Sequence, residues 1–477
     1  MRPPKFSSMS KRCYLRYIPF LVILLILLSF TQNVFPTGFA QKHSVAKNTR
    51  KGRLPVVIIP GLVGSELINR KTRKRVWFSI TRSKDDDMRL PVSPAISSNR
   101  DDLEAGDILR SIKVSRFLPE IKIYKSLIAS LEKDGYREGK IDDAASNGFE
   151  DTFYVFPYDW RRDNVENAHL LLRKLEGVRS KTGHPKLRFN IVAHSMGGLI
   201  ARYAAMYGQK DLSERMAGPA WEGVEYFNNI SLVGTPNGGS FLVLDSLLNG
   251  MSLSGTFRVN VPFVMDLTKF DVFTIPSIYQ LLPHEGLLRV FDENLKSIDV
   301  DLYDIESWKK YGWLAYDDKE FADQFSKEEQ EQAEEYFLAV LRRGMEFQAA
   351  LNAGPNTNPL IRIFNFGAEC KSTLDGMLVY EDPKSKKWKT LFVAESFKRG
   401  DGRTVSKQNV KELLFSSGDG QVSTASLNYS FVDKKNPVPI RNDFSIVCGH
   451  HSFLVEHEAV RKGIIDLFNS PPNSLAN

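Results

Sequence analysis

Ser195 lies in the segment NIVAHSMGGLIARY, residues 190–203, in a setting that suits a catalytic nucleophile. An apolar, strand-like run precedes the serine, and a helical pattern follows it. The turn between such elements is so sharp that the residues two before and two after the serine must be small, and here they are Ala193 and Gly197. The turn exposes the hydroxyl at the carboxyl edge of a sheet, where a helix amino terminus favours developing negative charge. We therefore interpret Ser195 as a nucleophile rather than as a turn serine without chemistry.

A serine hydroxyl is a poor nucleophile without a base, and the base needs an acid that orients it. Where a serine occupies such a turn, the acid and then the base follow it along the chain. His450 and His451 come directly after a strand-like run and just before the last helical segment. We choose His451 as the base and keep His450 as the alternative. We expect His457 to lie on a helix surface, His284 to lie in another region, and His194 to be structural, because neighbours in so tight a turn point apart.

The acid should end the strand that comes before the histidine segment. The segment FSSGDGQVSTASL places Asp419 between Gly418 and Gly420, a turn that can aim a short carboxylate. Asp443, in the segment RNDF, is the alternative, although it lies at the start of the final strand. We choose Asp419.

Acyl transfer also needs donors for the oxyanion of its tetrahedral intermediate. One donor is the backbone N–H that follows the nucleophile, at Met196. The second should come from the loop PGLVGS, residues 60–65, whose glycines let the backbone approach closely, and we assign it to Leu62.

Three adjacent acids in SKDDDMR, residues 83–89, lack the glycine and the ligand spacing of a metal loop. We expect neither a metal nor a cofactor.

The elements that must position these residues alternate between strands and helices. Helical periodicity fills segments that begin at residues 124, 165, 196 and 456, each with apolar residues at spacings of three and four. Such alternation predicts an α/β fold with a mostly parallel sheet that helices cover on both faces. The short β-branched or aromatic runs that we interpret as strands are residues 54–60, 153–157, 187–193, 230–236, 361–367 and 444–449.

A long insertion, residues 241–359, separates the fourth of these strands from the fifth. It begins with apolar segments and ends with a helix whose start carries a capping box from Ser326 to Glu329. It is either a lid that lines an acyl channel above Ser195 or additional core, and we favour the lid. The predicted core is then residues 54–240 and 360–468, followed by a tail, residues 469–477.

The amino terminus has the pattern of an export signal. Five basic residues and no acid are followed by the apolar run IPFLVILLILLSF, residues 18–30, and then by Gly38 and Ala40 at the spacing that a signal peptidase reads. We predict a signal peptide, residues 1–40, with a retained membrane anchor as the alternative, because the run is short for a span of about 20 residues. A basic linker, residues 41–53, would follow, and the protein would be exported to the periplasm or the outside of the cell.

Charge and cysteine content give two further expectations, one about partners and one about a disulfide. The net charge is +7, but residues 1–53 hold ten basic residues and no acid, so the remaining residues carry −3. A nearly neutral folded part gives no reason to expect nucleic acid as a partner. After cleavage, Cys370 and Cys448 would remain, and they are either a disulfide or two free thiols.

Six segments together carry a resemblance to a known family, the lecithin:cholesterol acyltransferases, over roughly residues 54–468. The resemblance implies an α/β-hydrolase with Ser195, Asp419 and His451 as nucleophile, acid and base. GTPNGGS, residues 234–240, is more similar to bacterial esterases and lipases, so we expect a bacterial-type member. The six segments, in order, are PGLVGSEL (60–67), PYDWR (157–161), AHSMGG (193–198), IPSIYQLLP (275–283), GDGQV (418–422) and the histidine segment IVCGHHSF (446–453).

By this resemblance, the expected activity is a serine-dependent lipid acyl hydrolase or O-acyltransferase. It would pass a fatty acyl group from a phospholipid-like ester, through an acyl-serine, to water or an alcohol. The expected partners are a lipid substrate and a membrane or micelle surface, and we interpret Asp159 and Arg161 of PYDWR as a structural ion pair. The alternatives are a plain carboxylesterase or triacylglycerol lipase and, from a different class, a non-catalytic envelope protein on a hydrolase scaffold.

Overall fold

A computed structural model of the chain describes residues 52–79, 87–113, 120–144, 148–214, 218–252, 266–354, 358, 360–429 and 444–470. The predicted signal peptide and most of the basic linker lie outside these residues, as do Asp443 and the insertion's residues 253–265. Within the described ranges, no helix is both long enough and apolar enough to cross a bilayer.

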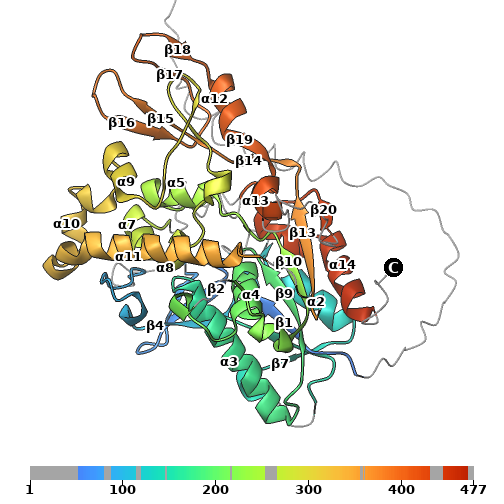
Figure 1. Ribbon diagram of the computed structural model, residues 1–477. Helices are drawn as coiled ribbons and strands as arrows, with labels where there is room; N and C mark the ends of the chain where they lie inside the picture. The colour runs from blue at the N-terminus through green and yellow to red at the C-terminus, as the bar shows by residue number, and fades with distance from the viewer. Residues whose placement is uncertain are drawn as a thin grey trace, which may run out of the picture. The chain divides into compact units, whose positions relative to one another are not determined.

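Seven parallel strands form the central sheet, in the order β20-β13-β10-β9-β1-β8-β7 (Figure 1). The inner strand β1 is buried at all four residues, as expected for a parallel sheet that is covered on both faces. Each of the six strands predicted from the sequence is present, and the predicted α/β fold is confirmed. The strand bounds are β1 Val56–Ile59, β7 Arg137–Gly139, β8 Thr152–Val155, β9 Phe189–His194, β10 Phe227–Val233, β13 Arg362–Ala368 and β20 Phe444–Val447.

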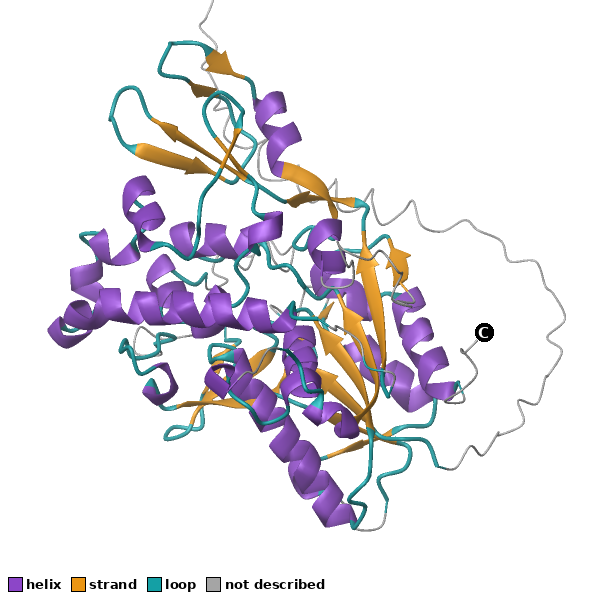
Figure 2. Ribbon diagram, in the orientation of Figure 1, coloured by secondary structure: helices purple, strands orange, loops and turns teal. Residues whose placement is uncertain are grey.

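Helices cover both faces of this sheet (Figure 2). On one face α3 (Asn164–Thr182) packs against α4 (Met196–Tyr207), and on the other α2 (Lys125–Lys133) packs against α14 (Glu458–Asn469). Local sequence sets the ends of α3: the Asp163 side chain accepts a hydrogen bond from the Val165 N–H at the start, and Gly183 adopts a left-handed conformation at the end.

The described part of the insertion has an aromatic interior of its own. The ring of Phe273 lies within 5.4 to 6.3 Å of those of Phe321, Phe325, Tyr336 and Phe337. The long helix α11 begins with the predicted capping box, in which Ser326 and Glu329 exchange hydrogen bonds. This aromatic cluster joins α7, α10 and α11. The helices of the insertion are α5 Phe241–Asn249, α7 Lys269–Phe273, α8 Pro276–Tyr279, α9 Ile305–Tyr311, α10 Phe321–Gln324 and α11 Lys327–Leu351.

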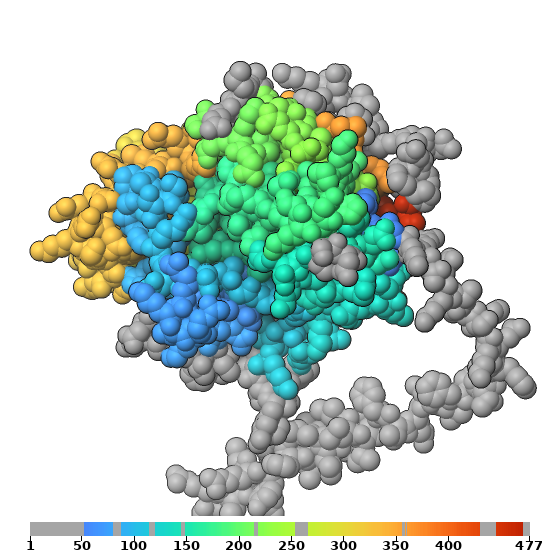
Figure 3. Space-filling view, turned by 90° about the horizontal axis from the view of Figure 1, so that it is seen from below, coloured from blue at the N-terminus to red at the C-terminus, as the bar shows by residue number. Residues whose placement is uncertain are grey.

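A small antiparallel sheet of β2 (Ser65–Asn69), β3 (Arg75–Trp77) and β4 (Leu103–Ile108) follows the loop after β1. The segment before β4 lies against the start of α11, where the Val92 N–H donates to Glu329 Oε1 at 3.4 Å. Figure 3 shows these blue segments beside the yellow helices of the insertion. The insertion is therefore held by the first part of the core as well as by its own packing.

A second group of short strands, which no pattern in the sequence predicted, separates β13 from Asp419. β14 and β19 form a two-stranded ribbon, and the other elements extend from it around a small cluster that includes Leu378, Leu391, Phe397 and Leu414. Strands of two to five residues are too short to show a clear period in the sequence. The elements are β14 Lys371–Leu374, β15 Met377–Glu381, β16 Trp388–Leu391, β17 Phe397–Lys398, β18 Thr404–Val405, α12 Lys407–Leu414 and β19 Phe415–Gly418.

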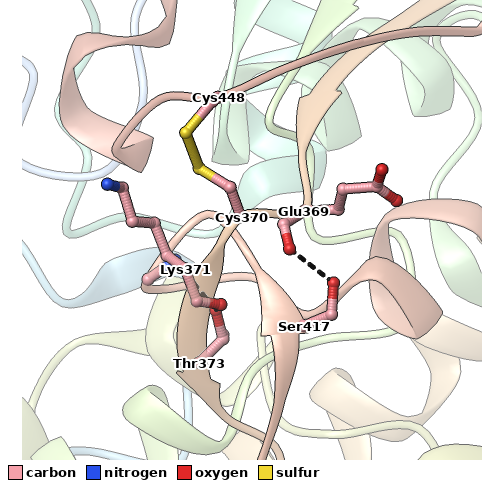
Figure 4. Close-up of a disulfide and its surroundings, with 7 residues drawn as sticks. Glu369, Cys370, Lys371, Thr373, Ser417 and Cys448 are labelled. Atoms are coloured by element: carbon pink, nitrogen blue, oxygen red, sulfur yellow. Dashed lines mark hydrogen bonds between the residues drawn. A yellow bond between two sulfur atoms is a disulfide. The ribbon is translucent and has the colours of Figure 1, made fainter.

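Cys370 and Cys448 form a disulfide, so the structure has the first of the two alternatives considered for these cysteines (Figure 4). The bond joins the residue before β14 to the residue after β20. Beside it, the hydroxyl of Ser417 donates to the carbonyl oxygen of Glu369 and closes the ribbon at the same end (Figure 4). The disulfide therefore fixes the base of the small strand group to the segment that leads into His450 and His451.

Candidate active site

Ser195 occupies the turn between β9 and α4 in a conformation that non-glycine residues rarely adopt, with φ 53° and ψ −126°. Its backbone N–H donates to the carbonyl oxygen of Val233 at 2.8 Å, which holds the turn against β10. A Cβ atom added at Gly197 would lie 2.5 Å from the carbonyl oxygen of Pro60, so only glycine fits there. The serine side chain remains partly exposed at the carboxyl end of β9.

The structure brings His451 into contact with both Ser195 and Asp419. Its Nε2 lies 2.8 Å from Ser195 Oγ, and its Nδ1 lies 2.7 Å from Asp419 Oδ2. A carboxylate can only accept, so Nδ1 carries the proton and Nε2 is free to accept one from the serine hydroxyl. His450 points elsewhere: its ring lies beside Gly420 and 6.0 Å, centroid to centroid, from the ring of Phe453.

The carboxylate of Asp419 is aimed by the turn that follows β19. Its Oδ1 accepts hydrogen bonds from the backbone N–H groups of Gln421 at 2.9 Å and Val422 at 2.7 Å, which leaves Oδ2 for the imidazole. The Gly420 N–H donates to Thr373 Oγ1 on β14 at 2.8 Å, so the ribbon supports the same turn. The His451 N–H donates to the Asp419 carbonyl oxygen at 3.0 Å, and this bond joins the acid and base segments directly.

The loop after β1 lies directly against the serine. A Cβ atom added at Gly61 would lie 2.8 Å from Ser195 Cβ, which shows how closely the backbone approaches. Next to it, Leu62 is half-buried, and its N–H donates to no acceptor among the described residues. Met196 is the first residue of α4, so its N–H has no partner within the helix. Both predicted donors therefore lie next to Ser195 with N–H groups that a ligand oxygen could accept from.

The PYDWR segment supports the loop of residues 60–65 through two hydrogen bonds. The hydroxyl of Tyr158 donates to the Pro60 carbonyl oxygen at 2.8 Å, and Trp160 Nε1 donates to the Ser65 carbonyl oxygen at 3.3 Å. Arg161 is fully buried and forms the predicted ion pair with Asp159, at 2.8 Å.

A second carboxylate, that of Asp101, lies 2.5 Å from the Arg161 guanidinium. Burial by itself would lower the pKa of this guanidinium, but the carboxylates of Asp159 and Asp101 outweigh burial and raise the pKa. The arginine is therefore charged, and its contacts are those of a support for the segment.

The IPSIYQLLP segment ties the insertion to the core. The hydroxyl of Ser277 donates to the Trp160 carbonyl oxygen at 2.6 Å. The side-chain amide of Gln280 donates to Asp163 at 2.9 Å and accepts from the Asn164 N–H at 2.8 Å, at the start of α3. PYDWR therefore contacts the loop after β1 directly, and IPSIYQLLP supports that loop indirectly, through its hydrogen bond to PYDWR.

A buried histidine and tyrosine connect the two loops on either side of the serine. Tyr124 Oη lies 2.9 Å from His194 Nδ1 and accepts from the Gly61 N–H at 2.9 Å, while His194 Nε2 lies 3.1 Å from the carbonyl oxygen of His451. Burial lowers the pKa of His194 to about 3, with a smaller contribution from nearby His451, so its ring is neutral at pH 7.

Only one placement of protons satisfies all these contacts. The carbonyl oxygen of His451 can only accept, so His194 Nε2 carries the ring proton, and Nδ1 accepts the phenolic proton of Tyr124. The sequence predicted a structural role for His194 but gave no sign of Tyr124, which is 70 residues away in the chain.

The insertion also reaches the site through the start of α5. Ser240 caps this helix by accepting from the Leu242 N–H at 3.3 Å, and its hydroxyl donates to the Gln421 carbonyl oxygen at 2.7 Å. The helix thus begins beside the Asp419 turn. Leu244 and Leu247 are buried, whereas Leu242 is only half-buried.

Taken together, this arrangement can transfer a proton from the serine to the imidazole and hold an oxyanion next to two N–H groups. Among the described residues, no group of three or more His, Cys, Asp or Glu side chains gathers as a metal site would require.

Comparison with known proteins gives one family and several structures. The family model of lecithin:cholesterol acyltransferase matches residues 71–318, just over half of the chain. No curated protein matches the sequence. A structure of the Tle4-Tli4 complex contains a chain that is 14% identical, with 89% of this chain and 99% of that one covered and a TM-score of 0.49.

Two further structures are less similar. The mature lipase BlEst2 of Bacillus licheniformis is 11% identical over 87% of this chain and 92% of its own, with a TM-score of 0.32. EstA of Clostridium botulinum is 13% identical over 93% of each chain, also with a TM-score of 0.32.

Proposed function

The chain belongs to the lecithin:cholesterol acyltransferase family, and is thus a lipid-ester hydrolase or acyltransferase; within that class, we propose that Ser195 is acylated by a phospholipid-like ester. The acyl group then passes from the serine to water or to an alcohol. The observation that carries the proposal is the pair of contacts from His451, 2.8 Å to Ser195 Oγ and 2.7 Å to Asp419 Oδ2.

In the first half-reaction, His451 Nε2 takes the hydroxyl proton while Ser195 Oγ attacks the ester carbonyl carbon. The N–H groups of Leu62 and Met196 receive the oxyanion, and the alcohol of the donor leaves with the proton from His451. The carboxylate of Asp419, held at His451 Nδ1, stabilises the imidazolium that forms. In the second half-reaction, water or an acceptor alcohol gives its proton to His451, attacks the acyl carbon and releases Ser195.

The close approach of Gly61 to Ser195 supports the assignment of the oxyanion site. Tyr158 and Trp160 hold the ends of the same loop, so its N–H groups are fixed before a substrate arrives. Preorganised donors stabilise developing charge without a cost of reorganisation at the moment of reaction.

We also propose that the acyl chain lies along the insertion, beginning at α5. Ser240 anchors this helix beside the acid turn, and half-buried Leu242 lies two residues further on. A channel that excludes water would let an alcohol compete for the acyl-enzyme, which is the difference between a transferase and a lipase with identical catalytic residues.

Export and action at a lipid surface complete the proposal. The basic start, the apolar run of residues 18–30 and the site at Ala40 support secretion, with mature protein starting near Gln41. Amino-terminal sequencing of protein from the producing cell tests this. A sequence that begins at Met1 or Arg2 on membrane-bound protein would establish the anchor instead.

A fluorophosphonate probe tests the central step, because it reacts only with an activated serine. We expect labelling of the wild-type protein and none of Ser195→Ala; absence of labelling in both would support the non-catalytic envelope protein. Lipid extracts incubated with the purified protein and analysed by mass spectrometry then identify donor and acceptor. Release of free fatty acid alone supports a lipase, whereas a new acylated alcohol supports a transferase.

A further inference from the structure

The turn between β15 and β16, together with the start of β16, displays four lysines and a tryptophan on the surface. We call it the basic tip and define it as Lys384, Lys386, Lys387, Trp388 and Lys389, all of which are exposed. It lies on the second strand group, between β13 and Asp419, and no step of the proposed reaction uses it. Figure 1 shows β15 and β16 extending away from the seven-stranded sheet.

The tip is an ordered turn rather than a loose loop. The Asp382 carboxylate accepts from the N–H groups of Lys384 at 2.9 Å and Ser385 at 2.8 Å. The backbone closes the turn through the Asp382 N–H, which donates to the carbonyl oxygen of Lys387 at 2.9 Å. Lysine side chains on such a turn project from a fixed backbone, so docking them would order fewer residues.

Two acids, Asp382 and the exposed Glu381, lie beside the four lysines, which leaves an excess of two positive charges at the tip. Asp382 pairs with Lys389 at 3.1 Å, but within the ranges that the structure describes, Lys384, Lys386 and Lys387 take part in no ion pair. The chain from residue 54 onward carries a net charge of −3, so this concentration of positive charge does not follow from the average composition.

Trp388 differs from every other tryptophan of the chain. All six lie in described segments, and the other five are at most 7% exposed, whereas Trp388 is 40% exposed. The ring packs edge-on against Tyr311 at 5.0 Å, and the Lys310 ammonium lies 4.8 Å from the Tyr311 ring. A tryptophan held at one edge, open at the other and surrounded by lysines suits the boundary between lipid headgroups and acyl chains, where one end of the ring is apolar and the other wet.

We propose that the basic tip docks the enzyme on bilayers that contain anionic lipid. The lysine ammonium groups contact headgroup phosphates, and Trp388 enters the interfacial region beside them. The inference rests on the proposed action at a lipid surface, and it adds the residues that contact the surface and the charge of lipid they select. The β14–β19 ribbon, which ends at Gly418, directly before Asp419, joins this surface to the site.

Vesicle binding tests the proposal separately from catalysis. The full-length Ser195→Ala protein is mixed with phosphatidylcholine vesicles containing 0 or roughly 30% phosphatidylglycerol, and the bound fraction is measured by co-sedimentation at low and high salt. We expect tighter binding to the anionic vesicles, weakened by salt. Replacing Lys384, Lys386 and Lys387 together by Glu should reduce this binding by at least about tenfold. Trp388→Ala should reduce binding to a smaller extent at all salt concentrations.

The matched control reverses the same number of charges elsewhere. Lys122, Lys133 and Lys140 are also exposed and in no described ion pair, and replacing these three by Glu should leave the binding within about twofold of the parent. Every variant carries the same amino-terminal residues, so any binding by the basic linker, residues 41–53, is common to all. The same tip substitutions are also made in the protein that keeps Ser195. There they should leave the rate of hydrolysis of a soluble short-chain ester unchanged, which shows that the variants fold.

Two results would overturn the inference: no preference for anionic vesicles, or equal losses in the tip and control variants. In either case, Ser195-dependent hydrolysis of micellar lipid would leave the proposed function standing. Conversely, tip-dependent binding by a protein without Ser195-dependent turnover would leave the docking surface standing and remove the proposed function.

Discussion

His194 Nε2 lies 3.1 Å from the backbone carbonyl oxygen of His451, so one buried histidine holds the backbone of the histidine that contacts the serine. Through Tyr124, the same imidazole is linked to the N–H of Gly61. The oxyanion loop and the base loop are therefore in one hydrogen-bonded chain, although they are almost 400 residues apart in sequence. A displacement of either loop changes the distance between the serine, the base and the oxyanion donors.

Tyr124→Phe should lower kcat by about tenfold to a hundredfold while KM stays nearly constant, because the hydroxyl orders the two loops without lying at the substrate. The measurement is steady-state turnover of a soluble p-nitrophenyl ester, with the rate of fluorophosphonate labelling as a second readout. Tyr136→Phe is the control: its buried hydroxyl has no hydrogen-bond partner in the described structure, so its loss should leave kcat unchanged. Equal kcat values for the two variants would show that the Tyr124 bridge positions nothing.

The depressed pKa of His194, about 3, makes stability depend on pH. Below an unfolded-state pKa of roughly 6.5 the unfolded chain binds a proton at this residue, while the folded protein does not until the pH approaches 3. The free energy of unfolding should therefore decrease as the pH falls through this window, by up to about 1.4 kcal/mol per pH unit from this group. Between pH 7.5 and 5.5, the free energy of unfolding measured in urea should decrease more for the wild type than for His194→Gln. Equal decreases in the two proteins would contradict a neutral buried imidazole.

Ser195→Ala, His451→Ala and Asp419→Asn should each remove most of the turnover, with losses on the order of 10⁴-fold, and double variants should lose little more because the three groups act as a unit. His450→Ala is the matched control, since its ring lies beside Gly420 and Phe453, and it should retain activity. Loss of activity in His450→Ala with retention in His451→Ala would reverse the choice of base.

Long-chain esters should be the better substrates, because each buried CH₂ contributes about 0.8 kcal/mol and two extra methylenes then raise kcat/KM by more than about tenfold. A series of p-nitrophenyl esters from acetyl to palmitoyl, with and without micelles, measures this. Leu242→Lys should flatten the chain-length profile, because Leu242 is only half-buried and can be changed without disrupting the core. Asn249→Lys, at the exposed end of the same helix, should not. A flat profile in the wild type would mean that the insertion is only core.

Removing the disulfide should destabilise the fold near the site. Cys370 and Cys448 are 78 residues apart, so the bond restricts a long loop in the unfolded chain, and the Cys370→Ser, Cys448→Ser double variant should lose about 2 to 4 kcal/mol of unfolding free energy. Because Cys448 is three residues before His451, kcat should also fall. Thermal unfolding with and without reductant checks this: reductant should lower the Tm of the wild type and leave the double variant unchanged.

The sequence determined the parts of this protein that depend on local pattern. Continuous apolar runs predicted the parallel strands, spacings of three and four predicted the helices, and small residues around Ser195 predicted its sharp turn, because each of these signals is contained within a few neighbouring residues. The order of serine, acid and histidine confined the acid and the base to residues after Ser195, and the local sequence then favoured Asp419 over Asp443 and His451 over His450.

Only the tertiary structure decided which distant groups meet. Tyr124 reaches His194, Tyr158 supports Pro60, and Ser240 reaches Gln421 through hydrogen bonds between segments that share no local signal. The small strand group was not predicted for a related reason. Its strands are too short to show a period in the sequence, and they are held by pairing with distant segments and by the disulfide. Packing and hydrogen bonding between segments far apart in the chain depend on the fold as a whole. The residue pattern within one segment therefore does not predict them.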